Sequence, residues 1–103
     1  MSEKAERRAL IRIAIELKPA VTVGAAGLTP GVLEELQRAL RDHELIKIRF
    51  NVVDREKRRA TAAQLAEQLD AELIQRVGKT IVLYRPNHDA DARLSNISRN
   101  SGD

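Results

Sequence analysis

The sequence predicts an α+β domain, an α/β two-layer sandwich with the element order α-β-α-β-α-β-β. Three segments place apolar residues at helical spacing, and short β-branched or alternating runs lie between them. The last two of these runs are separated only by Gly78 and Lys79, which indicates a hairpin and therefore antiparallel pairing. At 103 residues the chain is long enough for one core. We expect a four-stranded mixed sheet with the helices packed on one face.

The first helix is predicted over residues 3–17. Ser2 is a favoured N-cap, and Pro19 ends the helix because the residue before a proline is pushed out of the α region. The residues that form its apolar stripe are Leu10, Ile13, Ala14 and Leu17. The cations on its remaining faces are Lys4, Arg7, Arg8 and Arg12.

A short strand over residues 20–23 leads into the loop Gly24-Ala25-Ala26-Gly27-Leu28, and a helix is expected from Pro30 to about Asp42. Thr29 is a favoured N-cap, and a proline at the first helical position has no N–H to lose. The loop and the helix start together present backbone N–H groups and a positive dipole end, which suits an anion. A G-x-x-G loop is also a common form of tight turn, and the residues alone leave both interpretations open.

Residues 45–53 alternate between apolar and polar side chains, which predicts a half-buried strand. Lys47 and Arg49 fall on its outer face. His43 falls at the end of the preceding helix, where a histidine commonly serves the helix dipole or the free carbonyl groups.

A third helix is predicted from Arg55 to about Leu69, with Asp54 as its cap. Its first two turns hold the cations Arg55, Lys57, Arg58 and Arg59. The helix dipole disfavours cations there, so they indicate either a bound anionic partner or an ordinary solvated surface. We interpret the other cations as solvated surface; they include Arg38, Arg41, Arg76, Lys79 and Arg85.

Two strands over residues 72–77 and 80–85 complete the domain. The second is apolar on both faces, which is typical of a central strand. Pro86 stops it. Residues 87–103 show no periodicity and little apolar content, so we expect a domain over 1–86 and a mobile polar tail over 87–103.

Charge favours a polyanionic partner. The net charge is +3, and residues 1–85 hold sixteen Lys or Arg but twelve Asp or Glu. With one Phe, one Tyr and no Trp, a platform that stacks many bases is excluded. The absence of cysteine excludes disulfides and thiolate chemistry. No stretch reads as a signal peptide or a membrane span, so we expect a cytoplasmic protein without membrane association.

Several separated motifs resemble one known family. They are Leu17-Lys-Pro-Ala-Val, Gly24-x-x-Gly27-Leu-Thr-x-Gly31-Val-Leu, Ala39-Leu-x-x-His43-Glu-Leu-Ile-Lys47 and Gly78-Lys-Thr-Ile-Val-Leu-Tyr-Arg85. Over residues 3–86 the chain is similar to the CRM (chloroplast RNA splicing and ribosome maturation) domain, in particular to its single-domain bacterial form, the YhbY-like proteins.

This resemblance implies an RNA-binding module with a fold similar to the C-terminal domain of translation initiation factor 3. It also implies association with precursors of the large ribosomal subunit. Gly24 and Gly27 become the glycines of a loop that is likened to the backbone clamp of KH domains. Many family members place a lysine or another polar residue between the glycines, so Ala25 and Ala26 leave binding to the backbone and to neighbouring cations.

We therefore hypothesise that the chain contacts the phosphate backbone of structured, ribosomal RNA. The predicted primary site residues are Gly24, Ala25, Ala26, Gly27, Leu28, Thr29, Arg7, Arg8, Arg12 and Lys18. The predicted secondary site residues are Lys47, Arg49, Arg55, Lys57, Arg58 and Arg59. Which basic cluster shares the face of the loop is left open by the sequence.

No catalytic, metal or cofactor site is predicted, and we expect a monomer without a small-molecule substrate. Adjacent residues Asp42, His43 and Glu44 point in different directions at a helix end, and no nucleophile accompanies them. The loop also lacks the Lys-Ser/Thr of a nucleotide-binding P-loop. The alternative hypothesis is a protein-interaction module that docks a ribosomal protein or assembly factor, with RNA binding secondary.

Overall fold

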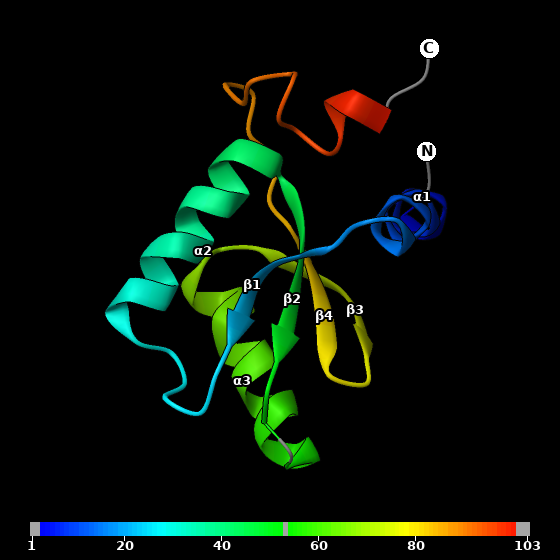
Figure 1. Ribbon diagram of the computed structural model, residues 1–103. Helices are drawn as coiled ribbons and strands as arrows, with labels where there is room; N and C mark the ends of the chain where they lie inside the picture. Colours follow the sequence, from blue (N-terminus) through cyan, green and yellow to red (C-terminus); the bar gives the residue numbers. More distant parts are fainter. Residues whose placement is uncertain (1–2, 53, 101–103) are drawn as a thin grey trace.

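The computed structural model describes residues 3–52 and 54–100, and Figure 1 shows their arrangement. The described elements are α1 (Glu3–Ile15), β1 (Pro19–Val23), α2 (Pro30–His43), β2 (Leu45–Phe50), α3 (Arg55–Gln68), β3 (Glu72–Val77), β4 (Thr80–Tyr84) and the 3₁₀ turn η1 (Ser98–Asn100). The α+β class and the element order are as predicted. The predicted cap Ser2 lies outside the described residues.

The four strands form one mixed sheet in the order β1-β2-β4-β3. β1 runs parallel to β2, and β4 runs antiparallel to both β2 and β3. The central position predicted for the last strand is confirmed, since Ile81, Val82 and Leu83 are all buried. Asp70 adopts a positive φ of 51° in the turn between α3 and β3.

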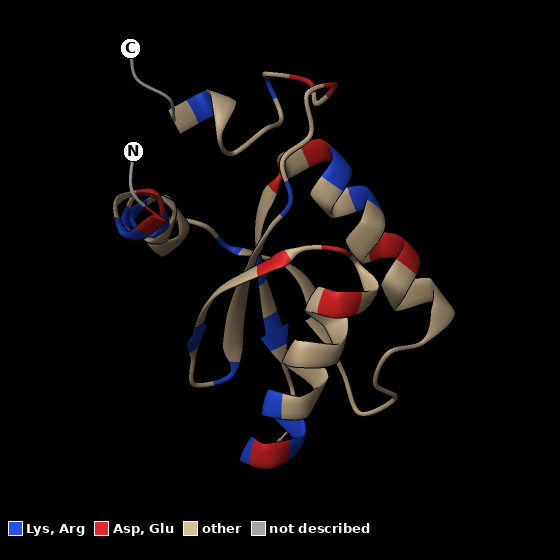
Figure 2. Ribbon diagram, turned by 180° about the vertical axis from the view of Figure 1, so that it is seen from behind, with Lys and Arg blue, Asp and Glu red and all other residues tan. Residues whose placement is uncertain are grey.

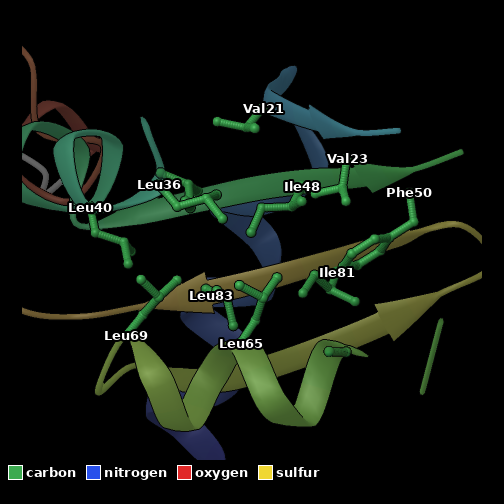
Figure 3. Close-up of a cluster of buried hydrophobic side chains, with 12 residues drawn as sticks. Val21, Val23, Leu36, Leu40, Ile48, Phe50, Leu65, Leu69, Ile81 and Leu83 are labelled. Carbon is green, nitrogen blue, oxygen red and sulfur yellow. The ribbon is translucent and has the colours of Figure 1, made fainter. Parts of the chain in front are cut away.

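The main core lies between the sheet and the helices α2 and α3 (Figure 3). Ile46, Ile48 and Phe50 point to this side because alternate residues of a strand share a face. Leu36 of α2 and Leu65 of α3 pack against them and are fully buried. The sheet and these two helices form the two packed layers that the apolar spacing predicts.

Helix α1 packs on the opposite face of the sheet, which corrects the expectation that all helices lie on one face. Leu10 and Ala14 pack with Leu45, Ile74 and Val82 in a second, smaller apolar cluster. The reason is that three different strands each contribute one apolar side chain to this face. The alternation within any single strand does not reveal such a patch. Lys47, on the same face, is therefore half-buried.

Three connections meet at one end of the sheet, which we call the loop end. The amide of Asn51 donates to the carbonyl of Val23 (2.9 Å), and the amide of Phe50 donates to the carbonyl of Lys79 (2.7 Å). These bonds bring together the loop after β1, the segment before α3 and the β3–β4 hairpin. Figure 1 shows all three at the lower end of the molecule, far from the termini.

Residues 87–100 fold back over the opposite end, which differs from the mobile tail that the sequence predicts. Ser95 is fully buried, and its hydroxyl donates to the carboxylate of Glu44. The amide of Asn96 donates to the carbonyl of His43 (2.9 Å), and its side-chain amide donates to the carbonyl of Leu45 (2.6 Å). This segment is held mainly by hydrogen bonds between polar groups, and a search for apolar periodicity does not detect such contacts.

Candidate nucleic-acid interface

The loop over residues 24–29 (the G-x-x-G loop) is a turn with part of its backbone left unpaired. The amide of Gly27 donates to the carbonyl of Gly24 (3.0 Å), and the amide of Thr29 donates to the carbonyl of Gly27 (3.1 Å). Gly27 has a φ of 75°, which explains a glycine at this position. Within the described part of the chain, the amides of Ala25, Ala26 and Leu28 donate to no acceptor.

The start of α2 directly follows the loop, and its predicted cap is confirmed. Thr29 is extended (φ −74°, ψ 160°), and its hydroxyl accepts a hydrogen bond from the amide of Val32 (3.2 Å). Pro30 occupies the first turn and supplies no N–H. The positive end of the α2 dipole therefore adjoins the loop, and no acidic residue lies in the first turn to neutralise it.

A groove of about 470 Å³ lies between the G-x-x-G loop and the first turns of α3. We call it the loop groove. Its lining residues are Gly24, Ala25, Gly27, Asn51, Val52, Lys57, Ala60 and Thr61. Lys57 is the one charged residue among them and is exposed. Of the basic cluster of α3, which the sequence ranks second, Lys57 is therefore the member that shares a groove with the loop.

The remaining α3 cations have different surroundings. Arg58 donates from Nη1 to the carbonyl of Val52 (2.7 Å), so it fastens the helix start to the preceding segment. Asp54 accepts hydrogen bonds from the amides of Glu56 (2.9 Å) and Lys57 (3.3 Å), as its predicted capping role requires. Arg55 and Arg59 line a different groove, on the hairpin side of α3. Figure 2 shows Lys and Arg gathered at the start of this helix and in the hairpin.

The cations of α1, which the sequence ranks first, are not brought to the loop. Arg7 donates to the carbonyl of Ile74 (2.8 Å) and pairs with Glu72 (3.2 Å), so it belongs to the edge strand β3. Arg8 and Arg12 are exposed on the same helix, across the sheet from α3. Sequence spacing could not predict this separation, because it depends on which face of the sheet α1 covers.

The strand cations and Lys18 are also spread apart. Lys18 precedes β1, whereas the G-x-x-G loop follows that strand, so the two lie at opposite ends of it. Arg49 is exposed near the loop end, and its Nε donates to Oδ1 of Asn51 (3.4 Å), a residue that lines the loop groove. Of these three cations, only Arg49 lies close to the loop groove.

His43 and its neighbour Glu44 serve the folded structure at the opposite end of the molecule. Nδ1 of His43 lies 2.8 Å from the carbonyl oxygen of Leu94. The Glu44 carboxylate accepts hydrogen bonds from the Ser95 hydroxyl and from the amide of Asn87 (2.7 Å). Among residues 3–52 and 54–100, no three His, Asp or Glu side chains gather as metal ligands would. These groups are thus committed to internal contacts.

Arg85 is a structural residue rather than the solvated cation that the sequence suggests. Its Nη1 donates to Oε1 of Gln37 and to the carbonyl of Leu69, both at 2.8 Å. It thereby joins α2 to the end of α3. The position just after an apolar strand is the only sequence signal for this role, and it does not distinguish a half-buried, internally bonded arginine from a solvated one.

No helix in the described ranges combines the length and the apolar character that crossing a membrane requires.

Comparison with known proteins gives a consistent result. The family model for the CRS1 / YhbY (CRM) domain matches residues 3–85. The chain is 48% identical over 86 residues to the probable RNA-binding protein PA4753 of Pseudomonas aeruginosa, covering 84% of this chain and 83% of that protein. It is 37% identical over 89 residues to a protein of Haemophilus influenzae named RNA-binding protein, covering 86% of this chain and 90% of the other.

A solved structure shares the fold. The solution structure of SAV1595 from Staphylococcus aureus superposes with a TM-score of 0.75 at 25% sequence identity, covering 88% of this chain and 95% of that one. The match of the family model extends from the start of α1 to just beyond β4, and it includes the G-x-x-G loop and α3. The chain therefore belongs to the CRS1 / YhbY (CRM) domain family.

Proposed function

We propose that this protein binds RNA by holding the phosphate backbone in the loop groove. The observation that carries the proposal is the meeting of two kinds of donor there. The backbone amide of Ala25, which lines the groove, and that of the adjacent Ala26 donate to no described acceptor, and Lys57 lines the groove from the facing helix. Relatives of this chain are named as RNA-binding proteins.

The chemistry of the loop groove suits a phosphodiester. Phosphate oxygens accept hydrogen bonds from backbone N–H groups and attract the positive end of a helix dipole. Ala25 and Ala26 are exposed and small, so a backbone can approach the main chain closely. Contacts of this kind position a protein on RNA without reading base sequence.

The proposal extends to a ribosomal target, as in the hypothesis drawn from the sequence. We propose that the RNA is ribosomal, that the protein acts in the cytoplasm during assembly of the large ribosomal subunit, and that it binds as a monomer. Its role is binding, not catalysis. The alternative of a protein-docking module predicts association with ribosomal particles that does not depend on the loop groove.

Two substitutions at Gly27 test the loop. Space around this residue is open, since an added Cβ would meet no heavy atom within 4 Å. Asp and Asn are matched in size and both tolerate positive φ, so both variants should fold at a cost of about 1 kcal/mol. A carboxylate about 4 Å from a phosphate costs about 1 kcal/mol in water and about 4 kcal/mol near a protein surface. Gly27→Asp should therefore weaken RNA binding at least fivefold relative to Gly27→Asn.

Filter binding to ribosomal RNA at several salt concentrations provides the readout. The slope of log affinity against log salt is negative, and Lys57→Gln should make it shallower by about one. Lys4→Gln on α1 removes the same charge and serves as the control. Equal affinities for the two Gly27 variants would refute binding at the loop. If the variants still associate with ribosomal particles to the same extent as the wild-type protein, the protein-docking alternative is favoured.

A further inference from the structure

A second groove, of about 590 Å³, lies between α3 and the β3–β4 hairpin. We call it the arginine groove. Its lining residues are Arg55, Glu56, Arg58, Arg59, Arg76 and Gly78. Four of the six are arginines, and Glu56 is the one carboxylate. The arginine groove is the most concentrated basic surface in the described structure that the proposed function has not used.

Three of the four arginines of the arginine groove make no described side-chain contact, whereas the fourth, Arg58, is held by the carbonyl of Val52. In the described part of the chain, the guanidinium groups of Arg55, Arg59 and Arg76 have no ion-pair or hydrogen-bond partner. Arg55 and Arg59 are four residues apart on one helix, where like charges repel by about 0.2–0.5 kcal/mol. They also lie in the first two turns of α3, where the dipole disfavours cations. Folding gains nothing from this placement, so an anionic ligand accounts for it better.

The first turns of α3 form a wall between the two grooves. Lys57, Ala60 and Thr61 face the loop groove, whereas Arg55 and Arg59 face the arginine groove. This division follows from helical geometry, because residues at spacings of three and four share a face. The two grooves are therefore separated by about one helix diameter, roughly 10 Å.

From this arrangement, and on the basis of the proposed function, we infer that the ligand is double-stranded RNA gripped by both of its backbones. The loop groove holds phosphates of one strand, and Arg55, Arg59 and Arg76 hold phosphates of the other. Arginine suits this task because its planar guanidinium binds phosphate oxygens in pairs. The two backbones of A-form RNA approach each other across the narrow major groove, so a single helix can reach both.

The aromatic content supports a duplex over a single strand. Proteins that hold single strands stack bases on exposed aromatic rings. Here Phe50 is buried in the core, with 1% of its surface exposed, and Tyr84 is half-buried at the far end of β4. Neither ring lines the loop groove or the arginine groove. The surface offers charge and amide groups for backbones and no platform for unpaired bases.

The test compares a stem-loop RNA with a single strand of the same composition that cannot pair, both measured by fluorescence anisotropy at several salt concentrations. The wild-type protein should bind the stem at least tenfold more tightly. The variant Arg55→Gln/Arg76→Gln removes one cation from each wall of the arginine groove. It should lower the salt slope on the stem by about two and leave binding to the single strand within twofold.

Arg8→Gln/Arg12→Gln is the matched control, since it removes the same charge from the exposed side of α1 and should leave both affinities nearly unchanged. Circular dichroism checks that each variant is folded. The inference is overturned if the single strand binds as tightly as the stem, or if Arg55→Gln/Arg76→Gln weakens both RNAs equally. In either case Gly27→Asp should still reduce binding. If Gly27→Asp matches Gly27→Asn on both RNAs, the proposed function itself fails.

Discussion

Replacement of Glu44 by alanine should detach residues 87–100 from the folded domain. Glu44 has 8% of its surface exposed and a φ of 63°, a region that costs a non-glycine residue about 1–2 kcal/mol. Its carboxylate accepts from the amide of Asn87 and from the buried hydroxyl of Ser95. These two bonds, together with those from Asn96 to the carbonyls of His43 and Leu45, connect the C-terminal segment to the corner between α2 and β2.

The size of the effect follows from these two bonds. A hydrogen bond to a charged group contributes about 1.5–3 kcal/mol, so the pair contributes about 3–6 kcal/mol. Alanine keeps the unfavourable φ and thus relieves no strain. Undocking the segment lets water hydrate the Ser95 hydroxyl, which limits the loss, and we expect a decrease of about 3 kcal/mol in the free energy of unfolding. Glu44→Gln keeps one acceptor oxygen, so its loss should be about half as large.

Two measurements separate detachment from general destabilisation. Denaturant unfolding gives the global change, and amide hydrogen exchange locates it. The amides of Asn96 and Ile97, which donate to the carbonyl of His43 and to the hydroxyl of Ser95, should exchange much faster in Glu44→Ala. Amides of β4 should change only by the global amount. If the Asn96 and Ile97 amides already exchange freely in the wild type, residues 87–100 do not dock on the domain in solution and the prediction is refuted.

Three further predictions concern stability. Arg85→Gln should cost about 2–4 kcal/mol in urea unfolding, because three acceptors lose a charged donor, whereas Arg38→Gln on the exposed side of α2 should cost less than about 0.5 kcal/mol. Thr29→Ala should cost about 1 kcal/mol in the same assay, since it removes the cap of α2. Burial, followed by the negative charges of Glu44, Glu6 and Glu72, raises the pKa of Tyr84. The folded state therefore holds this proton more tightly, so its contribution to stability is full below about pH 10 and is lost as pH rises through the folded pKa. Ultraviolet titration of this single tyrosine should show the raised pKa, and Tyr84→Phe should lose stability less steeply above pH 10.

The sequence predicts the local structure well because local signals are explicit in it. Thr29 and Asp54 cap the two helices that they precede, and the two-residue turn at Gly78 joins a hairpin. The alternation in β2 identifies the face that Ile48 and Phe50 present to the core. Each of these signals involves residues within a few positions of one another, so no knowledge of packing is needed.

Features that depend on distant residues are not predictable in this way. The face of the sheet that α1 covers depends on Leu45, Ile74 and Val82, which come from three strands. Docking of residues 87–100 depends on Glu44 and Ser95, which lie 51 positions apart. Polar partners of this kind have no periodicity, so the C-terminal segment resembles a disordered tail in composition.

The same dependence on distant residues explains why the proposed RNA-binding surface includes the basic cluster of α3 and not that of α1. A run of cations in a sequence gives the sign of the charge but not the side of the molecule that it faces. Only the fold shows which of these groups lack an acidic or hydrogen-bonding partner. At the end where residues 87–100 dock, the charged groups of Glu44 and Arg85 are used internally. At the loop end Lys57, Arg55 and Arg76 contact no described carboxylate within 4 Å, although repulsion between like charges opposes their proximity. The domain thus ties charged groups into internal hydrogen bonds at one end and leaves cations without a described carboxylate partner at the other, which is the physical basis for our proposal that a polyanion binds at the loop end.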